Sequence, residues 1–230
     1  MTYVVTDFRK IWSMKGVHKI TNEETSTEIA VYKDRVVFNG SNNSIDRVQN
    51  FDFKLITVSI LDTEVKVHEG FYNKFLSVKD ELFRFIDKKL EINFIGHSQG
   101  GALAHLASIL YKERHNDCIV KCFAFGCPRV GNKDFATLYD KNITSYRIYY
   151  GVDPIPMLPF TLNYQHTKNP IWVQTNGDII KQDRSKIKNG LILGSMMLSN
   201  CDLADSIQYQ DHNYDNIMKY KDQIIQALAN

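Results

Sequence analysis

The sequence lacks both a large excess of charge of one sign and a long hydrophobic run. Its 28 Lys and Arg residues nearly balance 26 Asp and Glu residues, for a formal net charge of +2. This charge gives no reason to expect a nucleic-acid partner, and no arginine-rich helix, zinc-finger spacing or aromatic platform motif occurs. The longest apolar stretch near the end, 190–198, is about half as long as a membrane span. We therefore expect a protein that can touch a lipid surface transiently without crossing it.

Cysteine is scarce, and the first ten residues lack both the basic start and the apolar stretch of a secretory signal. In an extended strand Cys118 and Cys122 would lie about 13 Å apart, too far for a disulfide. We expect these two thiols to be free and buried, like Cys127 and Cys201. The N-terminal sequence favours a cytoplasmic location, with leaderless release as the alternative.

Length and composition favour one domain over residues 1–230. With 43% hydrophobic and 23% charged residues, the chain is long enough to bury a substantial core. We find no internal repeat, low-complexity tract or interdomain linker. No H-E-x-x-H motif or other dense cluster of metal ligands occurs, so we expect neither a metal nor a cofactor.

Strand and helix patterns alternate along the chain. Apolar runs predict strands at 28–33, 35–38, 65–68, 90–95, 119–125 and 145–150. Helical spacing of apolar residues predicts helices at 71–89, 99–114, 132–139 and 214–228. Two short strands, 171–175 and 178–181, suit a hairpin around Asn176-Gly177. This alternation is typical of a mostly parallel central sheet with helices on both faces.

The most informative segment, 92–101, reads Ile-Asn-Phe-Ile-Gly-His-Ser-Gln-Gly-Gly. It is a G-x-S-x-G turn between a predicted buried strand and a predicted helix. Gly96 and Gly100 avoid collisions with the neighbouring strand and helix, while Ser98 takes a strained conformation that exposes its hydroxyl. The bare pattern occurs by chance in roughly one chain of this length in ten. The strand-turn-helix setting is what marks Ser98 as a nucleophile.

A nucleophilic serine needs a base, and the sequence offers seven histidines. In this class of sheet the chain order is serine, acid, histidine, which excludes His18 and His68. Three others are unfavourable as the base. The turn aims His97 elsewhere, His105 lies in the middle of a predicted helix, and His115 lies at the end of that helix.

Two histidines remain, His166 and His212. His212 lies in a short polar loop directly before the last predicted helix, where a mobile ring can reach the serine. Alternatively, Asp211 or Asn213 caps that helix and His212 is incidental. Position favours His212 as the base and His166 as a structural residue before the hairpin.

The acid should follow a strand between Ser98 and His212, and Asp153 does so directly after 145–150. The prolines that follow stiffen the loop that would hold its carboxylate toward the imidazole. Asp-Pro is also a common turn former, but this placement favours the catalytic role for Asp153.

Several of these motifs together resemble the class 3 lipase family, the fungal-type triacylglycerol lipases of the α/β-hydrolase fold. The resemblance extends from about Thr27 to Tyr214. The segments that carry it are Val-Phe-Asn-Gly-Ser (37–41), Val-His-Glu-Gly-Phe (67–71), Gly-His-Ser-Gln-Gly-Gly (96–101), Phe-Gly-Cys-Pro-Arg-Val-Gly-Asn (125–132), Asp-Pro-Ile-Pro-Met-Leu-Pro (153–159) and His212 with Tyr214. The chain departs from the family at Asn39, often arginine, in having no tryptophan at 44–51, and in its short length.

The resemblance implies a carboxylic ester hydrolase of lipase type that cleaves glycerides or related lipids through an acyl-enzyme. It implies a catalytic triad of Ser98, Asp153 and His212, with an oxyanion hole formed by the backbone N–H groups of Ser41 and Gln99. Phospholipase A1, short-chain esterase and acyltransferase activities would use the same residues. A catalytically silent lipid-binding module is the alternative from another class.

Residues 41–53 are predicted to form a small lid beside the oxyanion loop. Ile45, Val48 and Phe51 recur every three residues, so a short helix here would have one apolar side. That side would cover the serine in solution and turn toward lipid at an interface. Alternatively, these side chains pack into the core and do not move.

Overall fold

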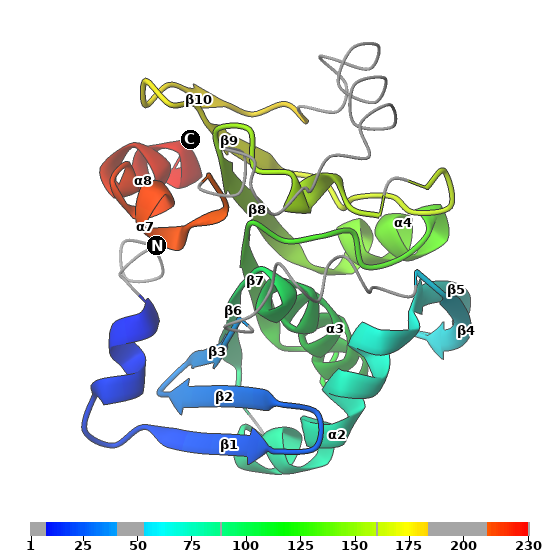
Figure 1. The fold of residues 1–230 in the computed structure, drawn as a ribbon. Helices are drawn as coiled ribbons and strands as arrows, with labels where there is room; N and C mark the ends of the chain where they lie inside the picture. The colour runs from blue at the N-terminus through cyan, green and yellow to red at the C-terminus, as the bar shows by residue number, and fades with distance from the viewer. Residues whose placement is uncertain (1–7, 41–52, 88, 160, 184–210, 230) are drawn as a thin grey trace.

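The protein is built around an eight-stranded sheet in the order β1-β2-β3-β6-β7-β8-β9-β10 (Figure 1). The computed structural model describes residues 8–40, 53–87, 89–159, 161–183 and 211–229. The strands are β1 (His18–Asn22), β2 (Thr27–Tyr32), β3 (Arg35–Phe38), β6 (Glu91–His97), β7 (Ile119–Phe125), β8 (Thr144–Tyr150), β9 (Pro170–Val173) and β10 (Ile179–Ile180). The run from β3 to β9 is parallel, whereas β1, β2 and β10 are added antiparallel. The predicted mostly parallel sheet is confirmed.

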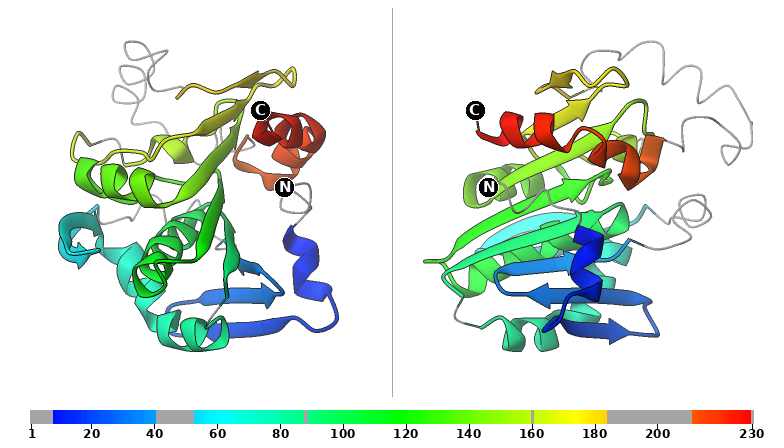
Figure 2. Two further views of the ribbon diagram at one scale, coloured as in Figure 1. Left: turned by 180° about the vertical axis from the view of Figure 1, so that it is seen from behind. Right: turned by 90° about the vertical axis from the view of Figure 1, so that its left-hand side faces the viewer.

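Helices cover both faces of this sheet, as Figures 1 and 2 show. One face carries α2 (Glu69–Phe85), α3 (Gln99–Arg114) and α4 (Lys133–Asn142), and the other carries the 3-10 helix η1 (Phe8–Ser13), α7 (Tyr214–Met218) and α8 (Lys221–Ala229). Each face has its own apolar cluster, with Phe75 and Leu106 in the first and Ile11, Ile217 and Leu228 in the second. The sheet is therefore buried on both sides, which explains the nearly continuous apolar character of its central strands.

The helix α2 follows the predicted spacing. Phe71, Phe75, Val78 and Leu82 recur every three or four residues and are all buried. Its partner α3 differs, because every residue from 100 to 111 is buried. A helix hydrophobic on all sides lies between other elements rather than on the surface, and α3 contacts α2, α4 and the sheet. This placement fixes its first residue rigidly beside the ends of the strands.

Several elements differ from the prediction. The strand expected at 65–68 is the end of β5 (Thr63–His68), which pairs with β4 (Leu55–Ile60) in a separate two-stranded sheet. The expected last helix is interrupted between α7 and α8, where Tyr220 stacks on Tyr150 and donates to the carbonyl of Thr175. A 3-10 turn, η2 (Ile155–Met157), follows β8.

Three of the four cysteines, Cys118, Cys122 and Cys127, are buried free thiols. Cys201 lies outside the described residues, as does most of the expected lid, 41–53. Among the helices of the described ranges, none has the length and hydrophobicity to span a bilayer.

One buried histidine should make the stability depend on pH. In α3, His105 donates from Nδ1 to the carbonyl of Gly101 at 2.9 Å, and its Nε2 lies 3.2 Å from the hydroxyl of Thr167. Burial lowers its pKa from 6.5 to about 4. Between about pH 6.5 and pH 4, His105 is therefore protonated in the unfolded chain but not in the folded chain. This histidine thus reduces stability progressively as the pH falls from 6.5 toward 4.

We expect His105→Gln to destabilise the protein at pH 7 through lost hydrogen bonds but to reduce the further loss of stability between pH 7 and pH 5. Urea midpoints at both pH values measure the two effects. His18→Gln is the matched control, because His18 lies half-buried on β1 against Phe85. An unchanged difference between pH 7 and pH 5 in His105→Gln would contradict the argument.

Candidate active site

Ser98 occupies the turn between β6 and α3, at the carboxyl ends of the parallel strands. Its backbone has φ 55° and ψ −126°, a conformation that costs about 1–3 kcal/mol for a residue with a side chain. Its N–H donates to the carbonyl of Phe125 at 2.8 Å, and its carbonyl accepts from the N–H of Gly101 at 3.0 Å. These bonds, one to β7 and one within the start of α3, hold the strained turn.

The two flanking glycines are required by close backbone contacts. A Cβ on Gly96 would lie 2.1 Å from the carbonyl oxygen of Gly100, and a Cβ on Gly100 would lie 2.6 Å from the carbonyl oxygen of Phe38. Real Cβ atoms do not approach this closely. The strands β3 and β6 and the start of α3 therefore meet backbone to backbone, as the G-x-S-x-G pattern predicted.

Asp153 and His212 come together from loops 59 residues apart in the chain. His212 donates from Nδ1 to Oδ2 of Asp153 at 2.9 Å, while Oδ1 of Asp153 accepts from the N–H of Ile155 at 2.9 Å. The carboxylate is completely buried and the imidazole nearly so. Because Nδ1 carries the proton toward the carboxylate, the lone pair of a neutral His212 ring lies on Nε2. That Nε2 is buried and has no hydrogen-bond partner among the described residues, Ser98 included.

The loop that carries His212 is held at three points. Asp211 accepts from the N–H of Val152 at 2.8 Å, in the loop that carries Asp153. On the other side, Asn213 caps α7 by accepting from the N–H of Asp215. The cap that we considered as the alternative role of this loop is therefore made by Asn213. The adjacent His212 is not incidental, because it pairs with Asp153.

His97 provides the third attachment. Its Nε2 donates to the carbonyl of His212 at 2.8 Å, and the two rings stack with centroids 4.6 Å apart. We expected from the sequence that the turn would aim this ring away from the site. It lies against His212 instead. Residue 97 is the last of β6, so its side chain points across the sheet edge toward the loop before α7. Only the pairing of distant loops reveals this contact, and the sequence carries no signal for it.

The other histidines have structural contacts. His166 donates from Nε2 to the carbonyl of Pro156, and burial together with Arg147 lowers its pKa well below the ordinary value. His68 caps α2 by accepting from the N–H of Phe71. The structure thus brings His212, and not His166, against the carboxylate of Asp153.

Of the two expected oxyanion donors, Gln99 is described by the structure. Gln99 is the first residue of α3, and its side-chain Oε1 accepts from Nζ of Lys74 at 2.7 Å. Ser41 lies outside the described residues. The preceding residue, Gly40, is so close to His97 that a Cβ on it would lie 3.1 Å from the His97 carbonyl oxygen. The chain leading to Ser41 therefore runs beside the serine turn.

Within the described ranges, no three His, Cys, Asp or Glu side chains gather in a way that could hold a metal ion. The site consists of a strained serine, a buried Asp-His pair and the N-terminus of a long helix. This combination of groups can support nucleophilic attack on a carbonyl and stabilise the resulting oxyanion.

Comparison with known proteins gives consistent matches. A family model described as lipase (class 3) matches residues 35–163, more than half of the chain. A secreted mono- and diacylglycerol lipase of Malassezia restricta is 38% identical over 121 residues, covering 47% of this chain and 39% of the relative. A secreted mono- and diacylglycerol lipase of Malassezia globosa is 32% identical over 154 residues, covering 60% of this chain and 51% of the relative. The chain therefore matches about two fifths to half of the length of these relatives.

Solved structures show the same fold at low sequence identity. Lipase II from Rhizopus niveus superimposes with a TM-score of 0.69 at 21% identity, covering 76% of this chain and 75% of that chain. The Rhizomucor miehei lipase propeptide complex gives a TM-score of 0.59 at 24% identity, covering 73% of this chain and 60% of that chain. These likenesses identify the architecture as an α/β-hydrolase fold.

The expected cytoplasmic location is wrong, because the Malassezia relatives are described as secreted. The expectation came from the amino-acid composition of the first ten residues alone. Export depends on a leader segment that is read and removed. The composition of the folded part therefore carries no information on the compartment.

A glycine beside the Asp-His pair offers a direct test of the site geometry. Gly126 has φ +53°, and a Cβ on it would lie 2.9 Å from Cε1 of His212 and 3.0 Å from Oδ2 of Asp153. Gly126→Ala should displace this pair and lower kcat on a soluble ester about 100-fold, as expected for a misplacement of about 1 Å.

The matched control is Gly16→Ala. Gly16 also has a positive φ, but nothing lies within 4 Å of a Cβ placed there. Both variants carry the conformational penalty of about 1–2 kcal/mol, and circular dichroism can confirm that both fold. Equal activities of the two folded variants would show that the pair does not need its observed position.

Proposed function

The chain belongs to the class 3 lipase family, and from this premise we propose that it hydrolyses carboxylic esters of glycerides or related lipids through an acyl-enzyme on Ser98. The observation that carries the proposal is the buried hydrogen bond of 2.9 Å between His212 and Asp153, in a fold that presents Ser98 on a strained turn at the same sheet edge. An imidazole oriented by a carboxylate, and a serine on a strained turn at the same edge of the sheet, are parts that acyl transfer requires.

In the proposed first step, Nε2 of His212 accepts the proton of the Ser98 hydroxyl as Oγ attacks the ester carbonyl. Asp153 keeps the imidazole in the tautomer with its proton on Nδ1 and stabilises the imidazolium that forms. The negative charge on the carbonyl oxygen is stabilised by the N–H of Gln99, at the positive end of the α3 dipole. The backbone N–H of Ser41 is the proposed second donor.

The tetrahedral intermediate then collapses. Its C–O bond to the leaving alcohol breaks, and the imidazolium of His212 returns its proton to that alcohol. Water, deprotonated by the same Nε2, then attacks the acyl-enzyme carbonyl. The bond between that carbon and Oγ of Ser98 breaks, the imidazolium returns its proton to Oγ, and the fatty acid is released. The proposed pathway balances protons without any group beyond substrate, water and these side chains.

Glycerides are the favoured substrates because two relatives are described as mono- and diacylglycerol lipases. Extracellular action on lipid is proposed on the same basis. Phospholipase A1, short-chain esterase and acyltransferase activities need the same triad, and a panel of glyceride, phospholipid and nitrophenyl esters of graded chain length separates them. Covalent labelling by a fluorophosphonate would exclude a catalytically silent lipid-binding module.

The triad assignment predicts strongly non-additive substitutions. Ser98→Ala and His212→Ala should each lower kcat about 10⁴-fold or more, and the double variant should be little worse because the two groups act as a unit. His166→Ala is the matched control and should lower thermal stability while sparing most activity. Rates on a soluble nitrophenyl ester measure these effects, and an inactive His166 variant beside an active His212 variant would reverse the assignment.

Transient contact with a lipid surface is the second part of the proposal. Two exposed apolar side chains, Val152 at 43% and Leu162 fully exposed, lie in the segment after β8 that also carries Asp153. Exposed apolar groups in this segment can enter the acyl region of a lipid surface.

Replacing both Val152 and Leu162 by serine should lower the rate on emulsified glyceride several-fold and leave the rate on a monomeric short-chain ester unchanged. Leu90→Ser is the matched control: Leu90 is 78% exposed but precedes β6, at the opposite ends of the strands. Equal losses on both substrates, or an equal effect of Leu90→Ser on emulsion, would refute contact through these two side chains.

A further inference from the structure

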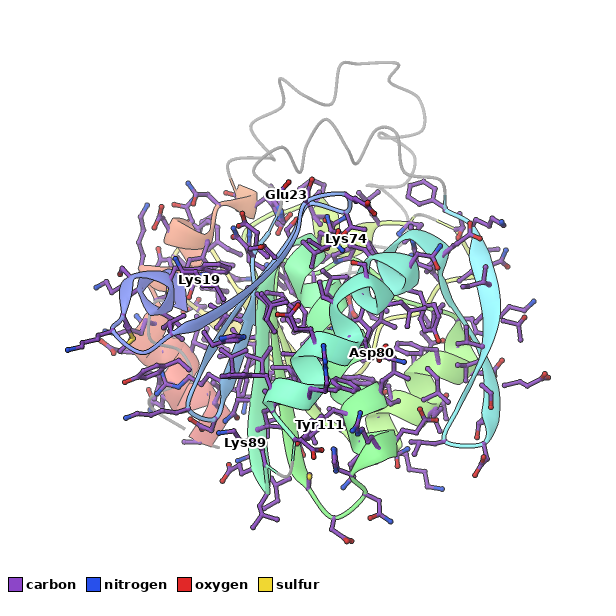
Figure 3. All side chains as sticks on the ribbon, turned by 90° about the horizontal axis from the view of Figure 1, so that it is seen from below. Lys19, Glu23, Lys74, Asp80, Lys89 and Tyr111 are labelled. Carbon is purple, nitrogen blue, oxygen red and sulfur yellow. The ribbon has the colours of Figure 1, made fainter. Side chains whose placement is uncertain are left out.

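Lys74 is an unusual lysine, because it is only 9% exposed on the apolar side of α2. Its helix neighbours Phe71, Phe75 and Val78 belong to the core. Burying an ammonium group costs free energy unless polar partners replace its water. Figure 3 shows Lys74 and Tyr111 at opposite ends of the layer formed by α2 and α3. Because Tyr111 lies near the end of α3, Lys74 lies toward its start, where Ser98 is found.

One partner of this ammonium is Gln99, the residue that follows Ser98. Nζ of Lys74 donates to Oε1 of Gln99 at 2.7 Å, a length typical of a charge-assisted hydrogen bond. Gln99 is partly buried and begins α3. Its backbone N–H is one of the helix-start donors with no partner within the helix. The side chain of this glutamine is therefore fixed by a neighbouring helix, while its backbone N–H is the donor assigned above to the oxyanion.

Covalent geometry places the charge close to the chemistry. The Oε1 of a glutamine lies within about 5 Å of its own backbone N. The Lys74 ammonium therefore lies within about 8 Å of the Gln99 N–H, a separation at which a charge in partly buried surroundings is only weakly screened. Two effects then coincide at one residue: the hydrogen bond restricts the rotamers of Gln99, and the positive charge adds to the dipole at the start of α3.

We propose that Lys74 is a positioning residue for the oxyanion hole, acting through Gln99 to hold and polarise the N–H that receives the developing negative charge. The proposal deepens the proposed function and rests on it. The ground-state ester carries no oxyanion, so this interaction strengthens mainly in the transition state. Loss of Lys74 should therefore reduce kcat and leave KM nearly unchanged.

The test compares three substitutions on a monomeric short-chain nitrophenyl ester. Lys74→Met removes both charge and hydrogen bond and should lower kcat about 10-fold, with KM changed by less than about twofold, as for an interaction made only in the transition state. Lys74→Gln can donate a hydrogen bond without charge and should fall between Lys74→Met and wild type. Lys74→Arg keeps both properties and should retain most of the activity.

Lys79→Met is the matched control. Lys79 lies on α2 five residues further along, beside the exposed Asp80. This substitution should leave kcat and KM at wild-type values. A parallel loss in Lys79→Met would show that any lysine on α2 has the effect through helix stability, and would overturn the proposal.

A double-mutant cycle tests whether the effect passes through Gln99. Gln99→Leu removes the acceptor but keeps the backbone N–H and the Lys74 charge, so it should lower kcat by a smaller factor than Lys74→Met. The double variant should be no worse than the more damaging single one, because both remove the same interaction. Multiplicative losses would show that Lys74 acts independently of Gln99 and would overturn the proposal.

The controls also separate this inference from the proposed function. If Ser98→Ala retains activity, the triad assignment itself fails. If Ser98→Ala is inactive while Lys74→Met has the kcat of wild type, only the role of Lys74 fails. Should Lys74→Met not fold, Gln99→Leu and Lys74→Gln decide the question, and unchanged kcat in both would reject it.

Discussion

The close packing of three backbone segments around Ser98 is the constraint on which the site depends. With a Cβ excluded at Gly96 and Gly100 by carbonyl oxygens 2.1 and 2.6 Å away, the strand, turn and helix have little freedom to adopt another arrangement. The turn is further tied to the adjacent strand by the hydrogen bond from Ser98 N–H to Phe125. The strain at Ser98 is therefore maintained by the surrounding fold, and the backbone of the turn has a fixed position before substrate arrives.

The parallel sheet brings the remaining groups to that position. The strands β6, β7 and β8 are neighbours in the sheet, so their carboxyl ends meet at one edge. Ser98 follows β6, Gly126 follows β7 and Asp153 lies in the loop after β8. The glycine between the other two leaves the space that His212 occupies against Asp153, since a Cβ there would contact both side chains at about 3 Å. Adjacent strands thus supply the proposed nucleophile, the space for the proposed base, and the proposed acid.

The sequence predicted the parts of the molecule that depend on local patterns. Central strands such as β7 are buried on both faces and appear as uninterrupted apolar runs, whereas β4 and β1 are partly exposed and their mixed composition gave no clear signal. Chain order and loop position identified Ser98, Asp153 and His212 as candidates. The contacts of His97 and Lys74 were missed, because each depends on a segment distant in sequence, at 212 and 99 respectively. A burial pattern gives the face on which a residue lies but not its partner across an interface.

Each fixed charge around the site is opposite in sign to the charge that acyl transfer would create next to it. When the proposed base takes the serine proton, an imidazolium and an oxyanion form on opposite sides of Ser98 Oγ. The buried carboxylate of Asp153 lies behind the imidazolium, and the start of α3 with the Lys74 ammonium lies behind Gln99, where the oxyanion is proposed to form. Both opposing charges are already in place and held by hydrogen bonds, so little reorganisation accompanies the reaction. On this argument, folding supplies the free energy needed to bury the carboxylate and the ammonium. The two charges then stabilise the transition state without moving.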